Sequence, residues 1–229
     1  MIVVYGSMTG NTEKVMRKMM ESWTKRDLVT TADMFDGNTI EHETEDLSAL
    51  VTSYDVLIVA TSSYGDGDPP DNYNKFLLQL LQAAQSATKP LKGMQHAVLG
   101  EGSSIYRETF QNCPRLTDKY LEECGSRRFL ARHEIDVGGT EPEDIGRNLF
   151  REEVFLRLKT LPPAASAPAA KWAEPREAHG EPKDQIKIKT AADLDDGGPA
   201  QTLGQKLVPF IVIVLAIVAY VYFKLDFAS

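Results

Sequence analysis

A nearly continuous apolar run at Tyr54–Ala60 most constrains the fold of this 229-residue chain. Apolar residues on both faces are typical of a strand buried on both sides in a parallel sheet. Similar runs occur at Met1–Tyr5 and His96–Leu99, and weaker strand patterns occur at Leu28–Met34 and Phe129–Ile135. Helical patterns separate these runs. The alternation predicts an α/β fold, a doubly wound, five-stranded parallel sheet with helices on both faces.

Five helices are expected, and the first of them carries apolar residues at spacings of three and four, which marks one buried face. They span Thr12–Lys25, Glu41–Leu50, Asp71–Ser86, Arg115–Cys124 and Pro142–Leu161.

Three of the expected strands end in loops rich in Gly, Ser, Thr and Tyr. The carboxyl ends of parallel strands meet at one edge of a doubly wound sheet, and ligands bind there. The convergence of three such loops predicts a binding site at this edge.

The first of these loops, Gly6–Thr12, has the composition of an anion site. Glycines let backbone N–H groups approach an anion, hydroxyl side chains add donors, and the next helix points its positive end toward the loop. The loop contains no Lys and no Gly-x-Gly-x-x-Gly pattern, so a single phosphate monoester fits better than a nucleoside triphosphate or a dinucleotide. At this point an ordinary strand-to-helix turn capped by Ser or Thr is also open.

A second feature is the uncharged run Leu207–Phe223, flanked by Lys206 and Lys224. About 17 to 25 apolar residues cross a bilayer, so we expect a transmembrane anchor here rather than a soluble core helix, which would need a polar stripe. The expected domains are a globular domain at 1–161, a flexible linker at 162–206, the anchor at 207–223 and a luminal or intermembrane tail at 224–229. The N-terminus does not resemble a signal peptide, so we expect the globular domain to lie in the cytosol.

The charge of the chain disfavours one class of partner. Residues 1–160 contain 18 Lys and Arg against 25 Asp and Glu, a net charge of −7 out of −8 for the whole chain. An acidic domain disfavours nucleic acid and favours basic protein partners. The two cysteines, Cys113 and Cys124, are too few for a metal cluster, and we expect them to be packing residues.

The three loops together resemble those of a known family. Tyr5–Thr12 resembles the phosphate loop of flavodoxins, and Tyr64–Asn72 is similar to the FMN domain of diflavin reductases such as cytochrome P450 reductase. Gly100–Tyr106 and Asp118–Arg128 continue this resemblance. It implies a flavodoxin-like fold with sheet order 2-1-3-4-5 and FMN as the cofactor.

The resemblance also implies which residues bind the flavin, with no metal ligand and no catalytic residue among them. The phosphate would be held by Ser7, Met8, Thr9, Gly10, Asn11 and Thr12. The second loop would contribute Thr61, Ser62, Ser63, Tyr64, Gly65, Asp66 and Gly67. The remaining contacts would come from Gly100, Gly102, Ser103, Tyr106 and Asp136. Tyr64 and Tyr106 match the aromatic residues that flank the isoalloxazine ring, and Asp136 matches an acidic residue near it.

Two departures from the family pattern are visible. Ser103 stands where Asn is usual, and residues 136–139 read Asp-Val-Gly-Gly where diflavin reductases carry several acids. The chain also continues into the linker and the apolar run rather than into an FAD- or NADPH-binding module.

The expected function is therefore that of a tail-anchored FMN protein that transfers single electrons. The donor would be a separate NAD(P)H-dependent FAD reductase, and the acceptor a haem, iron–sulfur or other membrane redox enzyme. Oxidoreductase activity is expected only together with that reductase. We expect the endoplasmic reticulum as the membrane first and the mitochondrial outer membrane second. A stand-alone NAD(P)H:quinone reductase and a non-redox, membrane-tethered interaction module are the alternatives.

Overall fold

The computed structural model describes residues 1–28, 32–40, 46–86 and 88–161. The chain divides into two units, 1–190 and 191–229, and all described residues belong to the first. The expected linker, anchor and tail at 162–229 lie outside the described residues. Among the helices that are described, none has the length and apolar character needed to span a membrane.

The core of the fold is a parallel sheet in the order β2-β1-β3-β4-β5, with β6 also paired to β4. This result confirms the predicted order 2-1-3-4-5. The strands are β1 (Ile2–Tyr5), β2 (Asp33–Asp36), β3 (Val56–Ser62), β4 (Gln95–Gly102), β5 (Arg127–Arg128) and β6 (His133–Asp136). The helices are α1 (Asn11–Lys25), α3 (Ser48–Ser53), α4 (Asn74–Gln85), α5 (Asn112–Glu123) and α6 (Glu143–Lys159), with 3₁₀ turns η1 (Asp71–Tyr73) and η2 (Ser104–Thr109).

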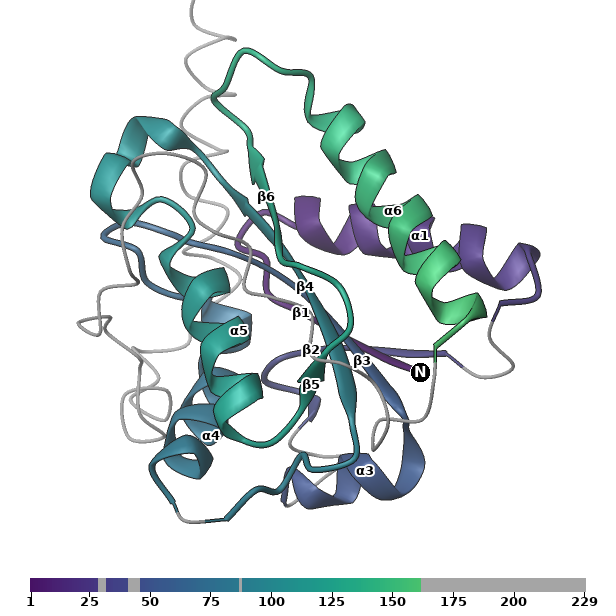
Figure 1. The fold of residues 1–229 in the computed structure, drawn as a ribbon. Helices are drawn as coiled ribbons and strands as arrows, with labels where there is room; N and C mark the ends of the chain where they lie inside the picture. Colours follow the sequence, from purple (N-terminus) through teal and green to yellow (C-terminus); the bar gives the residue numbers. More distant parts are fainter. Residues whose placement is uncertain (29–31, 41–45, 87, 162–229) are drawn as a thin grey trace, which may run out of the picture. The chain divides into compact units, whose positions relative to one another are not determined.

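Helices cover both faces of the sheet, with α1 and α6 on one face and α4 and α5 on the other (Figure 1). Alternate residues of each strand therefore pack into two separate hydrophobic cores, one on each face of the sheet. Leu57 and Val59 pack toward α4 and α5, whereas Ile58 and Ala60 pack toward α1 and α6. Because both faces of β3 are buried, the strand reads as a continuous apolar run in the sequence.

The prediction of a single last strand at Phe129–Ile135 is wrong. The two short strands β5 and β6 pair with opposite ends of β4, at Gln95–His96 and Leu99–Gly102. Between them the chain leaves the strand conformation, and Arg128 at the end of β5 and Arg132 just before β6 turn inward. Arg128 and Arg132 both bind the buried carboxylate of Asp118, at 2.7 and 2.8 Å. A buried guanidinium needs such a partner, and the strand is interrupted where these contacts form.

Several other boundaries differ from the predicted ones. Strand β2 begins at Asp33 rather than Leu28, and α3 spans Ser48–Ser53 instead of Glu41–Leu50. Residues 29–31 and 41–45 of these predicted elements lie outside the described residues. Helix α5 begins at Asn112, because Pro114 fits the first turn of a helix, where no N–H donor is needed.

Candidate cofactor-binding site

The predicted loops meet at one edge of the sheet because the strand register aligns their starting points. Tyr5 of β1 pairs with Ala60 of β3, and Ser62 of β3 pairs with Glu101 of β4. Gly102 at the end of β4 pairs with Asp136 at the end of β6. The structure therefore brings all three loops and Asp136 to the same edge.

The first loop passes very close to its neighbours at Gly6. A Cβ atom at this position would lie 2.5 Å from Oγ1 of Thr61 and 2.7 Å from the Tyr73 side chain. The Gly6 N–H group also donates to the carbonyl of Ala60 at 2.9 Å. Only glycine allows this approach, which fixes the start of the loop against β3.

The loop ends by presenting free backbone donors. Gly10 has a φ of 79°, a conformation that favours glycine, and immediately precedes α1. Within the described part of the chain, the N–H groups of residues 9–12 have no hydrogen-bond acceptor. These donors, together with the positive end of the α1 dipole, form an anion site.

Ser7 and Met8 are tied to a residue pair that the sequence reasoning did not assign. The Ser7 N–H group donates to Oδ1 of Asn72 at 2.8 Å, and Asp71 N–H donates to Sδ of Met8 at 3.2 Å. Asn72, in η1, thus fixes the position of the first loop. Because the Ser7 N–H group is already bonded, only the Ser7 hydroxyl is left to bind a ligand. In the sequence, the only signal for Asn72 is that it closes the second loop motif, Tyr64–Asn72.

The second loop is a tight turn that presents Tyr64. Tyr64 N–H donates to Asp68 O and Asp68 N–H donates to Tyr64 O, both at 2.8 Å. Gly65 and Gly67 supply the positive φ angles of 53° and 95° that close this turn. The ring of Tyr64 is left 59% exposed at the edge of the sheet.

Thr61 and Ser63 precede this turn, and both contact Cys113 of α5. Thr61 is fully buried and has its hydroxyl 3.8 Å from the sulfur of Cys113. Ser63 accepts a 3.0 Å hydrogen bond from the Cys113 N–H group. Burial raises the pKa of the Cys113 thiol to about 12, so the thiol stays protonated and acts as a packing group.

Asp136, the last residue of β6, holds the third loop in place. Its Oδ1 accepts hydrogen bonds from Ser104 N–H at 2.9 Å and Gly138 N–H at 3.0 Å. These contacts join η2 to the loop that follows β6. Tyr106 in η2 is 58% exposed, like Tyr64. The carboxylate that the sequence placed near the flavin is thus partly engaged by backbone donors.

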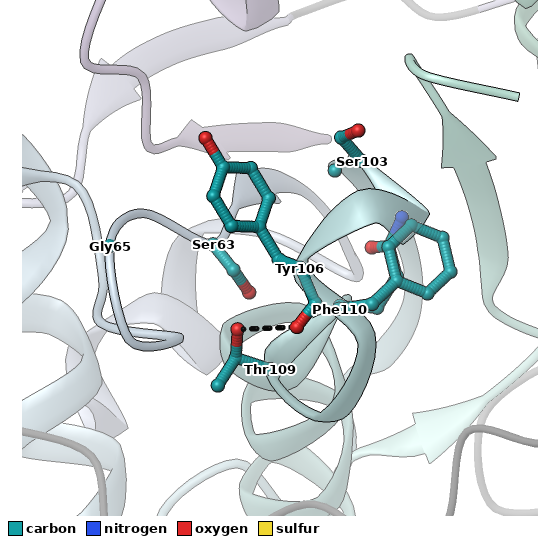
Figure 2. Close-up of a pocket in the computed structure, with 8 residues that line it drawn as sticks. Ser63, Gly65, Ser103, Tyr106, Thr109 and Phe110 are labelled. Carbon is teal, nitrogen blue, oxygen red and sulfur yellow. Dashed lines mark hydrogen bonds between the residues drawn. The ribbon is translucent and has the colours of Figure 1, made fainter.

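A small hollow separates the second and third loops (Figure 2). Tyr106 and Ser103 stand on one side of it, and Ser63 and Gly65 belong to the opposite loop. Its lining consists of Ser63, Gly65, Gly102, Ser103, Tyr106, Thr109, Phe110 and Gln111. Thr109 donates to the carbonyl of Tyr106 at 3.2 Å, which stabilises the turn that carries this ring.

Gln111 is the second site residue that sequence reasoning missed. Its Nε2 donates to the carbonyls of Gly100 and Ile135, at 3.3 and 2.9 Å. Its Oε1 is buried and has no hydrogen-bond partner among the described residues. A Cβ at Gly100 would collide with this oxygen, which explains the glycine there. A buried acceptor without a partner is costly, so this oxygen is an exception among the buried polar atoms of the described residues.

The donor set matches an aromatic phosphate monoester. Backbone N–H groups at the start of α1 suit a phosphate, and two exposed tyrosines on separate loops suit a flat ring. The hollow between these loops is lined by residues of both, Gly65 and Ser63 from one and Ser103 and Tyr106 from the other. These residues fit FMN.

The fold and the site together define a cofactor-binding domain of the doubly wound parallel class. Residues 3–147 match the protein family described as Flavodoxin. The chain belongs to the flavodoxin family, and this membership confirms FMN, the cofactor of flavodoxins, as predicted. Within that family, the chain is an electron-transfer domain related to diflavin reductases.

The relatives include large redox proteins. The chain is 34% identical over 139 residues to bifunctional cytochrome P450/NADPH–P450 reductase 1 of Bacillus subtilis, covering 61% of this chain and 12% of the relative. It is 32% identical over 144 residues to NADPH–cytochrome P450 reductase of Sus scrofa, covering 62% and 20%. The chain therefore spans only a small part of the length of these relatives.

Among solved structures, the chain is similar to the flavodoxin of Streptococcus pneumonia TIGR4. The two are 28% identical with a TM-score of 0.53, and the match covers 68% of this chain and 97% of that flavodoxin.

Proposed function

We propose that the chain is a membrane-anchored FMN protein that carries single electrons between two separate redox partners. The observation that carries this proposal is the site itself, an anion cradle at α1 with Tyr64 and Tyr106 exposed on two neighbouring loops. FMN supplies the electron chemistry when bound. The protein holds it at an exposed edge of the sheet, where a partner can approach.

The donor that we propose is an NAD(P)H-dependent FAD reductase, and the acceptor is a haem, iron–sulfur or other membrane redox enzyme. The names of two relatives support this choice, because they join an NADPH-dependent reductase to cytochrome P450. The acidic balance of residues 1–160 supports docking to basic partner surfaces.

The membrane part of the proposal rests on the uncharged run Leu207–Phe223. A tether would confine the domain near a membrane-bound acceptor and raise its effective concentration. We propose the endoplasmic reticulum as this membrane, with the mitochondrial outer membrane as second choice. Fusing residues 200–229 to a fluorescent reporter tests the location, and diffuse fluorescence would overturn it.

The electron-transfer proposal is tested on the full chain purified in detergent and loaded with FMN. We expect a long-wavelength absorbance band at half-reduction with dithionite, which marks one-electron transfer, and slow reduction by NADPH alone. Addition of an FAD reductase should make NADPH reduction fast. Rapid bleaching by NADPH alone would instead indicate a quinone reductase, and failure to bind FMN would indicate a non-redox module.

A further inference from the structure

A buried acid lies directly behind the expected phosphate loop. Glu101 is the penultimate residue of β4, and its side chain is only 5% exposed. The hydroxyl of Thr12, in the first turn of α1, donates to Oε2 of Glu101 at 3.5 Å. An ionised carboxylate at this place would repel a bound phosphate, since like charges in a protein interior are weakly screened.

The cation that offsets the charge of Glu101 comes from α6, not from α1, the helix that carries Thr12. Nε of Arg147, in α6, donates to Oε1 of Glu101 at 2.8 Å, and the Arg147 side chain is 16% exposed. Its Nη1 lies 2.6 Å from Glu143 in the same helix. Helix α6 lies beside α1 on one face of the sheet (Figure 1). Glu101 is thus shared between the two helices, with Thr12 of α1 on Oε2 and Arg147 of α6 on Oε1.

We propose that Arg147 is a positioning residue for the FMN phosphate, because it neutralises Glu101 behind Thr12. This inference rests on the proposed placement of the phosphate in the first loop. Thr12 has one hydroxyl proton, for which Glu101 and a phosphate oxygen compete. The bond at 3.5 Å is at the long limit for a hydrogen bond and therefore weak. Arg147 draws the carboxylate charge toward α6 and leaves this proton available to the phosphate.

The test compares two ligands on the full chain in detergent, FMN and riboflavin, which lacks the phosphate. In Arg147→Met, the Glu101 charge is no longer offset. We expect the FMN dissociation constant to rise by about tenfold, the effect of one uncompensated charge within about 10 Å at an effective dielectric constant of about 20. Riboflavin affinity should change less than twofold.

Charge rescue separates this role from simple support of the fold. Adding Glu101→Gln to Arg147→Met removes the repelling charge and should restore FMN affinity to within about threefold of the wild type. Arg147→Lys retains the positive charge and should stay within the same range. Glu101→Gln alone should leave FMN affinity unchanged or higher, whereas a purely structural ion pair would lose affinity in both single variants.

The matched control is Glu152→Gln, which removes an ion pair between α6 and the residue that follows α1. Glu152 binds Arg26 at 2.8 Å, at the far end of α1 from the loop. This variant should leave both affinities unchanged. Equal losses of FMN and riboflavin in Arg147→Met, or no rescue by Glu101→Gln, would overturn the inference. A wild-type chain that binds riboflavin as tightly as FMN would overturn the phosphate placement itself, and the inference with it.

Discussion

The carboxylate of Asp118 accepts a 2.7 Å hydrogen bond from Nε of Arg128, and neither side chain has any exposed surface. Its second oxygen binds Arg132 at 2.8 Å. The contacts join α5 to the interrupted edge of the sheet. Asp118→Asn keeps the size of the side chain but removes the charge that both guanidinium groups face. We expect a loss of about 3–5 kcal/mol of unfolding free energy, measured by urea unfolding.

The control for this substitution is Glu13→Gln. Glu13 binds Arg17 at 2.7 Å on the exposed side of α1, where solvent weakens an ion pair. The unfolding midpoint of this control should stay close to that of the wild type. Similar midpoints for the two variants would contradict a special role for the buried cluster.

Acid should destabilise the domain in two stages. Burial lowers the pKa of His96, so this side chain resists protonation in the folded state. Below about pH 6.5 the unfolded chain then binds more protons than the folded chain. The free energy of unfolding therefore decreases as the pH is lowered. For Asp118, burial alone would raise the pKa, but the hydrogen bond with His96 and the charges of Arg128 and Arg132 outweigh it and lower the pKa. Its contribution is complete above about pH 4 and is lost as pH falls further.

Urea midpoints measured from pH 7.5 down to pH 3 would show this behaviour. The slope of unfolding free energy against pH should be positive below about pH 6.5 and should steepen below about pH 4. In Asp118→Asn, the steep part should be reduced. A midpoint that stays constant across this range would contradict the assignment.

Removing either exposed tyrosine should weaken flavin binding without affecting the fold. Tyr64→Ala and Tyr106→Ala each lose one stacking surface, for an expected cost of about 1–2 kcal/mol, or about five- to thirtyfold in the FMN dissociation constant. Fluorescence quenching on titration measures it. Leu156→Ala, at an equally exposed apolar residue on α6, should leave FMN affinity unchanged.

Gly6→Ala should disrupt the first loop. The added methyl group would collide with Thr61 and with the buried Tyr73, so we expect a cost of about 1–3 kcal/mol and a clear loss of FMN affinity. Gly93→Ala is the comparison, since Gly93 has a φ of 105° near the opposite end of β4. It should lower stability but retain FMN affinity.

The two cysteines should resist modification in the folded protein. Both are buried, and burial raises the pKa to about 12 for Cys113 and about 11 for Cys124. A chromogenic thiol reagent at pH 8 should react slowly with the native protein and label two thiols after unfolding. Rapid labelling of the native protein would contradict this packing role.

The sheet order was predictable because strands buried on both faces leave continuous apolar runs such as Tyr54–Ala60. The broken last strand was not, since Arg128 and Arg132 look like surface residues until Asp118 is placed beside them. The three loops were identified from their glycines and hydroxyl groups, whose backbone chemistry is local.

Contacts between residues far apart in the sequence could not be predicted, because they leave no local sequence pattern. Asn72 reaches Ser7 across 65 residues, and Arg147 reaches Glu101 across 46. Gln111 had no signal of its own, because its role depends on two carbonyls from different strands. Asp136 was assigned to the ligand, yet its carboxylate also holds two backbone N–H groups.

The sheet edge formed by β5 and β6 is split into two short strands, which affects how closely packed copies of the chain can interact. Strand edges are where separate chains add to one another and begin to aggregate. One edge consists of two strands of two and four residues, and the other, β2, has four residues with an aspartate at each end. Within the described residues, neither edge offers a long template to a second copy. Many copies packed together at high local density should therefore remain separate molecules.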